Sequence, residues 1–342
     1  MAALVLTILL GPRPSYPDAD PVMKPLKASL TDLDAHVADL NSKVPKLKPN
    51  NEGRILWAND TNKTQTDVSI LFLHGFSASP REAYPMVPDF AGKYGCNAYL
   101  PLLEGHGIDS EDSFQELTPA DLIHSARDAL AVSQVLGKRT IVVGSSTGCT
   151  LAIYLAAMNP EAIDGMYLFS PNIDLADPTS RFLLWPWGLQ MGRMVVGKRR
   201  TIEEWIGTES EQYWTMTYRT EGIVALKYLL KNTMTDEVFA KVKQPVYASY
   251  YYKDDSLCDH TISIPEIKRF YENLGTPAEQ KKLVASPDAG GHVMTCDLRV
   301  KPEVMEGMLK DMSDFGEKVL GMEVPVVNTE NESPDSLISL EE

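Results

Sequence analysis

The chain has 342 residues, of which 44% are hydrophobic and 8% aromatic, and this is enough for one large domain with an insertion. Its formal net charge of −15 argues against nucleic acid as a partner and against binding to an anionic membrane through a basic patch. The four cysteines have no C-x-x-C spacing, and the sequence contains no phosphate-binding or dinucleotide-binding loop. The sequence therefore implies neither a metal nor a cofactor.

The chain begins with an apolar stretch. Residues 2–10 are apolar or Thr, and nine residues are too few to span a bilayer. No Lys or Arg precedes the stretch, and no small-x-small cleavage site follows it. Two interpretations stay open: residues 1–20 hold an export signal or anchor, which we favour, or the protein is cytoplasmic with an apolar terminus. The first would permit weak membrane association through the N-terminus.

Predicted elements follow in chain order. Leucine and valine recur every three or four residues between residues 26 and 44, which predicts an amphipathic helix that packs on the core. Apolar runs then predict strands near 53–58, 68–73, 97–100, 139–143, 165–170, 246–252 and 282–285. Helical runs lie between them, near 80–93, 118–135, 147–158, 262–273 and 302–319. This alternation predicts an α/β fold with a parallel sheet and helices on both faces, built from residues 21–170 and 245–322.

Residues 171–244 interrupt the alternation. They contain four of the five tryptophans, several methionines and helical patterns, so we expect a helical cap inserted between two core strands. The aromatic and Met side chains could form the small core of the cap or an adaptable apolar pocket, and we expect them to do both. We assign Trp185 and Trp187 to substrate binding. The tail, residues 323–342, is acidic and polar, and we predict that it is disordered.

The most informative motif is the pentapeptide Gly-Ser-Ser-Thr-Gly at 144–148. It follows a β-branched run at 140–143 and precedes a helical run of small residues. A strand, a sharp turn with glycines two positions either side of a serine, and a helix are typical of a nucleophile elbow, which exposes the hydroxyl of Ser146. A glycine-rich loop could carry the same letters by chance, but the flanking elements favour a catalytic serine.

Such a serine needs a base and an acid. Three carboxylates, Asp254, Asp255 and Asp259, follow the strand predicted at 246–252. We favour Asp255, because the acid of hydrolases is commonly followed by a short apolar pair, here Leu-Cys, and the other two stay open. His292 lies in a glycine-rich loop after the strand predicted at 282–285 and is the candidate base. The order Ser, Asp, His at successive strand ends supports this assignment.

These segments resemble the α/β-hydrolase superfamily, and in particular its monoacylglycerol-lipase-like and carboxylesterase branch, which is grouped with serine aminopeptidase-type hydrolases. The resemblance rests on residues 73–80, 100–107 and 290–293 together with the elbow, and it covers about residues 50–320. It implies a mostly parallel central sheet and a cap insertion. It also implies that the backbone N–H groups of Phe76 and Thr147 form the oxyanion hole.

The expected function is serine hydrolysis of carboxylic esters through an acyl-enzyme on Ser146, with a small-molecule or lipid-like ester as substrate. Two alternatives within enzymes use the same residues, a serine peptidase and an acyltransferase. A non-catalytic binding protein of the same fold is a third alternative. The complete set of serine, acid and histidine argues against it, since a binding module has no need of all three.

Two cysteines flank the candidate acid and base. Cys258 follows Asp255 by three residues, and Cys296 follows His292 by four. Because the acid and the base must be hydrogen-bonded, their loops should be neighbours, and a disulfide between the two cysteines is one interpretation. The other, which we favour, is two separate buried thiols that pack as small apolar side chains.

Overall fold

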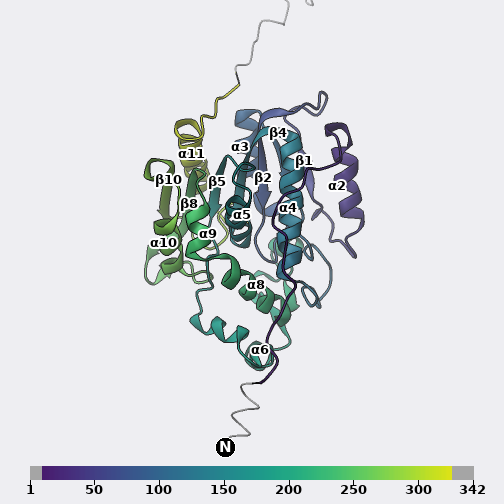
Figure 1. The fold of residues 1–342 in the computed structure, drawn as a ribbon, viewed down its shortest axis with the longest axis vertical. Helices are drawn as coiled ribbons and strands as arrows, with labels where there is room; N and C mark the ends of the chain where they lie inside the picture. Colours follow the sequence, from purple (N-terminus) through teal and green to yellow (C-terminus); the bar gives the residue numbers. More distant parts are fainter. Residues whose placement is uncertain (1–9, 326–342) are drawn as a thin grey trace, which may run out of the picture.

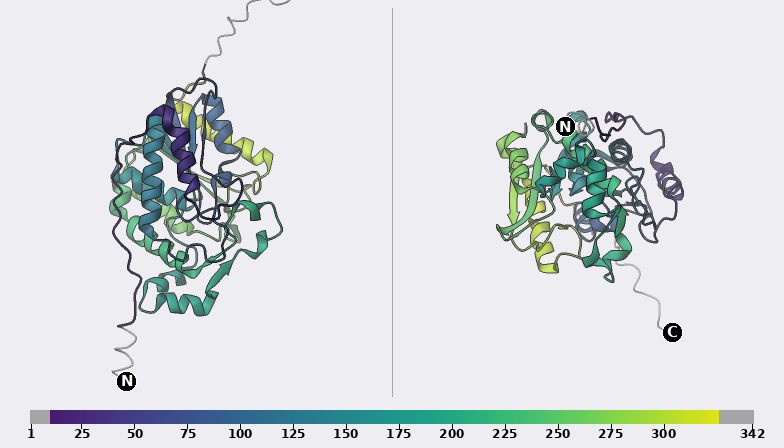
Figure 2. Two further views of the ribbon diagram at one scale, coloured as in Figure 1. Left: turned by 90° about the vertical axis from the view of Figure 1, so that its right-hand side faces the viewer. Right: turned by 90° about the horizontal axis from the view of Figure 1, so that it is seen from below.

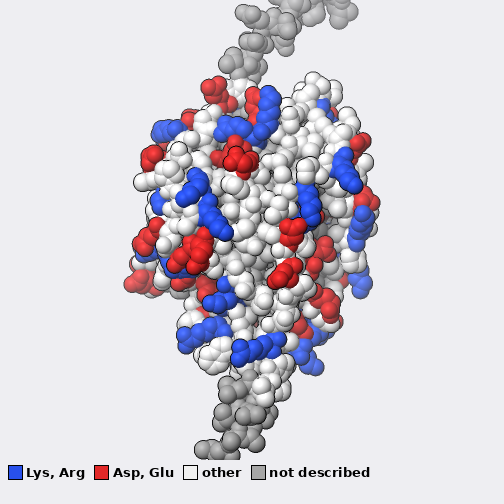
Figure 3. All heavy atoms as spheres, viewed as in Figure 1, with Lys and Arg blue, Asp and Glu red and all other residues white. Residues whose placement is uncertain are grey.

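A computed structural model describes residues 10–325 of the chain. The apolar stretch at residues 2–10, except for its last residue, and nearly all of the tail predicted to be disordered lie outside the described residues. None of the described helices is both long and apolar enough to cross a membrane. On the face drawn in Figure 3, cationic and anionic side chains are interspersed.

An eight-stranded sheet forms the centre of the molecule, in the order β1-β3-β2-β4-β5-β8-β10 with β9 paired to β8 (Figure 1). The strands are β1 (Arg54–Leu56), β2 (Thr66–Leu73), β3 (Asn97–Leu100), β4 (Gly137–Ser145), β5 (Gly165–Phe169), β8 (Val246–Asp254), β9 (Leu257–Cys258) and β10 (Lys281–Ser286). Strands β3, β2, β4, β5, β8 and β10 are mutually parallel, and β1 pairs antiparallel with β3. The predicted α/β fold with a mostly parallel sheet is confirmed.

Helices cover both faces of the sheet (Figure 1). The larger ones in the core are α2 (Leu33–Ser42), α3 (Met86–Tyr94), α4 (Pro119–Leu136), α5 (Thr147–Met158), α9 (Asp236–Lys241), α10 (Ile264–Asn273) and α11 (Pro302–Lys318), with short 3-10 helices η1 (Leu30–Asp32), η2 (Pro80–Ala83) and η5 (Ala278–Gln280). Alternate residues of β2 divide between the two faces. Leu71 and Leu73 pack toward α4 and α5, whereas Ile70 and Phe72 pack toward α3 and α11. Burial on both faces explains the near-continuous apolar runs of the strands.

Local signals in the sequence account for where several helices begin and end. Thr118 caps α4 through a reciprocal capping box with Asp121, and Pro119 occupies the first helical position. The helix expected over 26–44 is shorter than predicted. Ser29 caps the 3-10 helix η1, which leads into α2 at Leu33. Helix α2 ends at Ser42, shortly before Pro45, which disfavours helical backbone in the residue before it.

The insertion between β5 and β8 extends from the C-terminal ends of the strands (Figures 1 and 2). It contains η3 (Pro178–Leu184), α6 (Gly188–Val196), η4 (Glu203–Trp205), α7 (Ser210–Tyr213) and α8 (Thr220–Thr233), followed by α9. It also holds an antiparallel pair, β6 (Arg199–Thr201) and β7 (Thr217–Arg219). The cap is therefore mixed rather than purely helical. This pair was missed because each strand is three residues long and its partner lies far along the chain.

Candidate active site

Ser146 occupies the turn between β4 and α5. Its backbone has φ 52° and ψ −114°, a conformation that is strained for a residue with a side chain. The glycines on either side permit the tight packing: a Cβ added to Gly148 would lie 1.8 Å from the carbonyl oxygen of Leu73, and one added to Gly144 would lie 2.8 Å from the backbone nitrogen of Cys149. The pentapeptide thus has the strand-turn-helix geometry of a nucleophile elbow.

His292 connects Ser146 to a buried carboxylate. It lies in the loop between β10 and α11, with Nε2 2.9 Å from Ser146 Oγ and Nδ1 2.7 Å from Asp259 Oδ2. Asp259 is only 4% exposed, and its Oδ1 accepts the N–H of Thr261 at 2.8 Å. Because a carboxylate only accepts, Nδ1 carries the proton and leaves Nε2 free to accept from the serine hydroxyl. The backbone oxygen of His292 accepts a hydrogen bond from Ser170 Oγ, which helps to hold the loop.

Asp255, which we favoured as the acid, is not the carboxylate that contacts His292. Strand β8 runs two residues further than predicted and turns back through β9, so Asp255 lies at an exposed hairpin tip, where it accepts a hydrogen bond from the Tyr252 hydroxyl at 2.8 Å. Asp254 instead accepts the backbone N–H groups of Ser256 and Leu257 within the turn. The returning strand brings Asp259 beside His292. The Asp-Asp-Ser turn signal directly after the strand could have indicated the hairpin.

The histidine and the carboxylate shift each other's pKa. Burial alone would raise the pKa of Asp259, but the charge and hydrogen bond of His292 outweigh it, and the pKa lies below the usual range. Burial alone would lower the pKa of His292, but the charge and hydrogen bond of Asp259 outweigh burial there too, and this pKa is raised above 6.5. The carboxylate of Asp259 therefore makes the imidazole of His292 a stronger proton acceptor, as a general base requires.

The loop after β2 passes alongside the nucleophile. A Cβ added to Gly75 would lie 3.3 Å from Ser146 Cβ, and the buried His74 holds the loop with Nδ1 2.9 Å from the carbonyl oxygen of Gly75. Phe76 and Thr147 both line the cavity above the serine. Thr147 is the first residue of α5, so its N–H has no acceptor within the helix. These two backbone N–H groups remain our candidates for the oxyanion hole.

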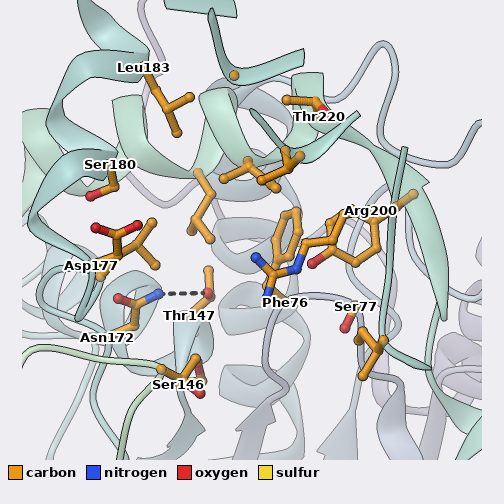
Figure 4. A pocket seen from close by; sticks show the side chains of 18 of the residues that line it. Phe76, Ser77, Ser146, Thr147, Asn172, Asp177, Ser180, Leu183, Arg200 and Thr220 are labelled. Carbon is orange, nitrogen blue, oxygen red and sulfur yellow. Dashed lines mark hydrogen bonds between the residues drawn. The ribbon is translucent and has the colours of Figure 1, made fainter. Parts of the chain in front are cut away.

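A cavity of about 780 Å³ opens above Ser146 between the core and the cap (Figure 4). Apolar side chains make up much of its wall, and they include Phe76, Leu175, Phe182, Leu183, Met191, Val195, Ile202, Trp205, Ile223 and Leu226. Polar residues also line it, and they include Asn172, Asp177, Ser180, Arg200 and Thr220, all labelled in Figure 4. The site can therefore enclose a mostly apolar molecule beside the serine.

The structure separates the two tryptophans that we assigned to substrate binding. Trp185 lines the cavity. Trp187 instead packs against the N-terminal segment: it approaches so closely that a Cβ added to Gly11 would lie 1.9 Å from its Nε1, and its backbone N–H donates to the carbonyl oxygen of Pro12. Two tryptophans that we did not assign, Trp205 and Trp214, also line the cavity. Their ring centroids lie 5.3 Å apart in a small hydrophobic cluster shared by the cap and the core.

All four cysteines are free thiols. Cys296 is buried, and its Sγ accepts a hydrogen bond from Arg81. Cys258 is half-buried in β9, where its Sγ lies 3.9 Å from His260 Nδ1. The two cysteines therefore form no disulfide, and Cys296 is a buried thiol as the favoured interpretation has it, whereas Cys258 is only partly buried. Among the described residues, no cluster of His, Cys, Asp and Glu could hold a metal ion.

Residues 70–294 match the model of the alpha/beta hydrolase family. That segment makes up more than half of the chain, and it contains Ser146, Asp259 and His292. The chain belongs to the alpha/beta hydrolase family. Family membership agrees with the sheet order and with the elbow at the end of β4.

Parts of the chain are similar to two characterised proteins. It is 32% identical over 108 residues to the thermostable monoacylglycerol lipase of Bacillus sp. (strain H-257), an alignment that covers 32% of this chain and 42% of that protein. It is 29% identical over 143 residues to the protein PHYLLO, chloroplastic, of Arabidopsis thaliana, which covers 40% of this chain and 8% of that protein. The alignments thus span less than half of either relative.

Solved structures share the fold. A structure from work on LipS and LipT, two metagenome-derived lipolytic enzymes, has a TM-score of 0.62 at 18% identity and covers 79% of this chain and 98% of that chain. A soluble variant of monoglyceride lipase from Saccharomyces cerevisiae has a TM-score of 0.55 at 13% identity, with 77% and 90% covered. The monoacylglycerol lipase of Paleococcus ferrophilus has a TM-score of 0.53 at 12% identity, with 77% and 98% covered. At these identities, the likeness concerns the fold alone.

Proposed function

We propose that the chain is a serine hydrolase that cleaves carboxylic esters. The observation that carries the proposal is the hydrogen-bonded chain from Ser146 Oγ through His292 to Asp259 at the base of a largely apolar cavity. The partial similarity to a protein named as a monoacylglycerol lipase supports an ester with an apolar acyl chain as the substrate class.

The proposed reaction uses the serine as nucleophile and the histidine first as base and then as acid. Ser146 Oγ attacks the ester carbonyl while His292 Nε2 takes its proton, and Asp259 stabilises the resulting imidazolium. The N–H groups of Phe76 and Thr147 would stabilise the negative charge that develops on the carbonyl oxygen. The imidazolium then protonates the leaving alcohol. Water, activated by the same imidazole, attacks the acyl-enzyme and releases the acid and free Ser146.

The proposal is tested by removing the nucleophile. Ser146→Ala should lower esterase kcat by on the order of 10⁴-fold or more and abolish labelling by a fluorophosphonate probe, because only an activated serine reacts with it. Ser42→Ala, a change on an exposed helix face, is the matched control and should be labelled at the wild-type rate. Undiminished labelling of Ser146→Ala would overturn the proposal. A panel of p-nitrophenyl esters beside aminoacyl anilides distinguishes an esterase from a peptidase.

A further inference from the structure

A second buried carboxylate lies next to the proposed site. Glu82 belongs to η2 and is only 2% exposed. Its Oε2 accepts the backbone N–H of Gly75 at 2.6 Å, and its Oε1 accepts the hydroxyl of Ser145 at 3.0 Å. Its backbone oxygen accepts the hydroxyl of Thr295 at 2.8 Å. Glu82 thus joins the loop after β2, the end of β4 and the segment just beyond His292.

The Glu82 carboxylate forms no salt bridge with Lys or Arg in the described part of the chain. Among residues 10–325, no Lys or Arg nitrogen lies within 4.0 Å of it. Burial raises the pKa of Glu82, and the hydrogen bonds from Gly75 and Ser145 oppose that rise. An amide at this position could accept from Gly75 and donate to Ser145 Oγ without the cost of burying a charge. A carboxylate is therefore the costlier choice for purely structural bonding.

The negative charge of Glu82 can stabilise the protonated imidazole of His292. Glu82 and His292 line the same cavity beside Ser146, and Asp259 is hydrogen-bonded to the imidazole. The charges of Asp259 and Glu82 both raise the pKa of His292. The other ionisable groups near Glu82 are the thiols of Cys149 and Cys296, whose pKa values burial raises, so they stay neutral. In its ionised form, Glu82 is thus a second anion that acts on the histidine from the side of the loop after β2.

We propose that Glu82 is a positioning residue for the proposed ester hydrolysis: its carboxylate holds the loop carrying Gly75 against the strand that ends at Ser146, and its charge stabilises the imidazolium of His292. This inference rests on the proposed function, because it concerns the same serine and histidine. It assigns the loop geometry and part of the basicity of the imidazole to a side chain outside the hydrogen-bonded chain of Ser146, His292 and Asp259.

Glu82→Gln tests the charge while it keeps the shape. The titration of His292 is followed by NMR of its ring C–H resonances, identified by their loss in His292→Asn. Without the anion, the midpoint should fall by on the order of one pH unit, and the acidic limb of kcat/KM should move to lower pH with it. We expect kcat to fall about tenfold, with KM little changed, because the loop is held less well for the transition state. Glu306→Gln, an exposed change on α11, is the control and should move neither quantity.

Two further measurements separate the proposal from misfolding. Glu82→Gln should melt at or above the wild-type temperature, since it removes a buried charge, whereas Glu82→Ala should lose more activity because it also loses both hydrogen bonds. An unchanged or raised His292 midpoint in Glu82→Gln would overturn the proposal. The NMR titration needs no turnover. The two proposals can therefore fail separately. If the His292 midpoint shifts in Glu82→Gln but a fluorophosphonate does not label the wild-type protein, the proposed function is refuted and the effect of the Glu82 charge on His292 still holds.

Discussion

At the scale of single residues, the site depends on where one proton sits. His292 holds it at Nδ1 against Asp259 and offers Nε2 to Ser146. Because the pKa of His292 is raised above its usual value, the imidazolium loses its extra proton only as the pH rises through this raised pKa. Proposed activity should therefore increase from acidic toward neutral pH and be lost as the histidine is protonated.

The acid is the first residue to test. Asp259→Asn should lower kcat by on the order of 10³- to 10⁴-fold, because an amide favours the wrong imidazole tautomer. Asp255→Asn is a matched change four residues away, at the hairpin tip, and kcat should stay within about twofold of wild type because it is a change at an exposed position. Steady-state kinetics on one p-nitrophenyl ester compare the two. The reverse ranking would contradict the assignment of Asp259.

At the scale of elements, the contact between α5 and the strands beneath it positions the nucleophile. The start of α5 lies so close to β2 that Gly148 has no room for a methyl group against Leu73. The strained backbone of Ser146 persists because this packing holds it from both sides. The elbow is therefore a property of the β4–α5 junction rather than of the serine alone.

Gly148→Ala should accordingly destabilise the fold by about 3 kcal/mol, because backbone must move to admit the new carbon. Gly307→Ala is the control: this glycine lies inside α11 with no atom within 4 Å of its added Cβ, and its replacement should stabilise by about 0.5–1 kcal/mol. Chemical denaturation with both variants measures the difference. Equal stabilities would show that α5 can move away from β2 at little cost.

The cap supplies the proposed acyl-binding wall. Its apolar lining predicts higher kcat/KM for acyl chains of about four to ten carbons than for acetyl, since each buried methylene contributes ~0.8 kcal/mol. Trp185→Ala should weaken that preference, because this ring lines the cavity. Trp187→Ala should leave it in place, because this ring packs on Gly11. A chain-length series in which acetyl esters react fastest would refute the prediction.

At the scale of the whole molecule, the N-terminal segment connects the cap to the core (Figure 1). The carbonyl oxygen of Pro12 accepts a hydrogen bond at the start of α6, and the ring of Tyr16 contacts that of Tyr228 on α8 at a centroid distance of 5.0 Å. Further along, the backbone N–H of Met23 donates to Asn159 at the end of α5. The segment thus binds two cap helices and one core helix in succession.

Tyr16→Ala should therefore lower the free energy of unfolding by about 1–2 kcal/mol, because it removes a half-buried aromatic contact. Tyr16→Phe keeps the ring and should lose far less. Thermal and chemical unfolding of both variants provide the measurement. A Phe variant as unstable as the Ala variant would place the stabilisation in the hydroxyl instead of the ring.

Much of this protein follows from local sequence. The apolar runs predicted the seven main strands and the helices α4, α5, α10 and α11 to within a few residues, because both faces of the sheet are buried. The helix predicted at 80–93 is instead divided into η2 and α3. Ser146 and His292 were also predicted from local sequence. Each lies in a glycine-containing turn or loop that follows a strand, and the structure shows the hydrogen bond between them.

Tertiary structure decided what depends on partners distant along the chain. Asp259 reaches His292 only because β9 folds back on β8, and a hairpin that short has too few residues to show a period of its own. The pairing of β6 with β7 and the separate surroundings of Trp185 and Trp187 were undetermined for a similar reason. Which face a cap residue presents is set by the packing of the cap on the core and on the N-terminal segment. Local propensity favours a type of element, and only long-range contacts choose between neighbouring carboxylates or neighbouring rings.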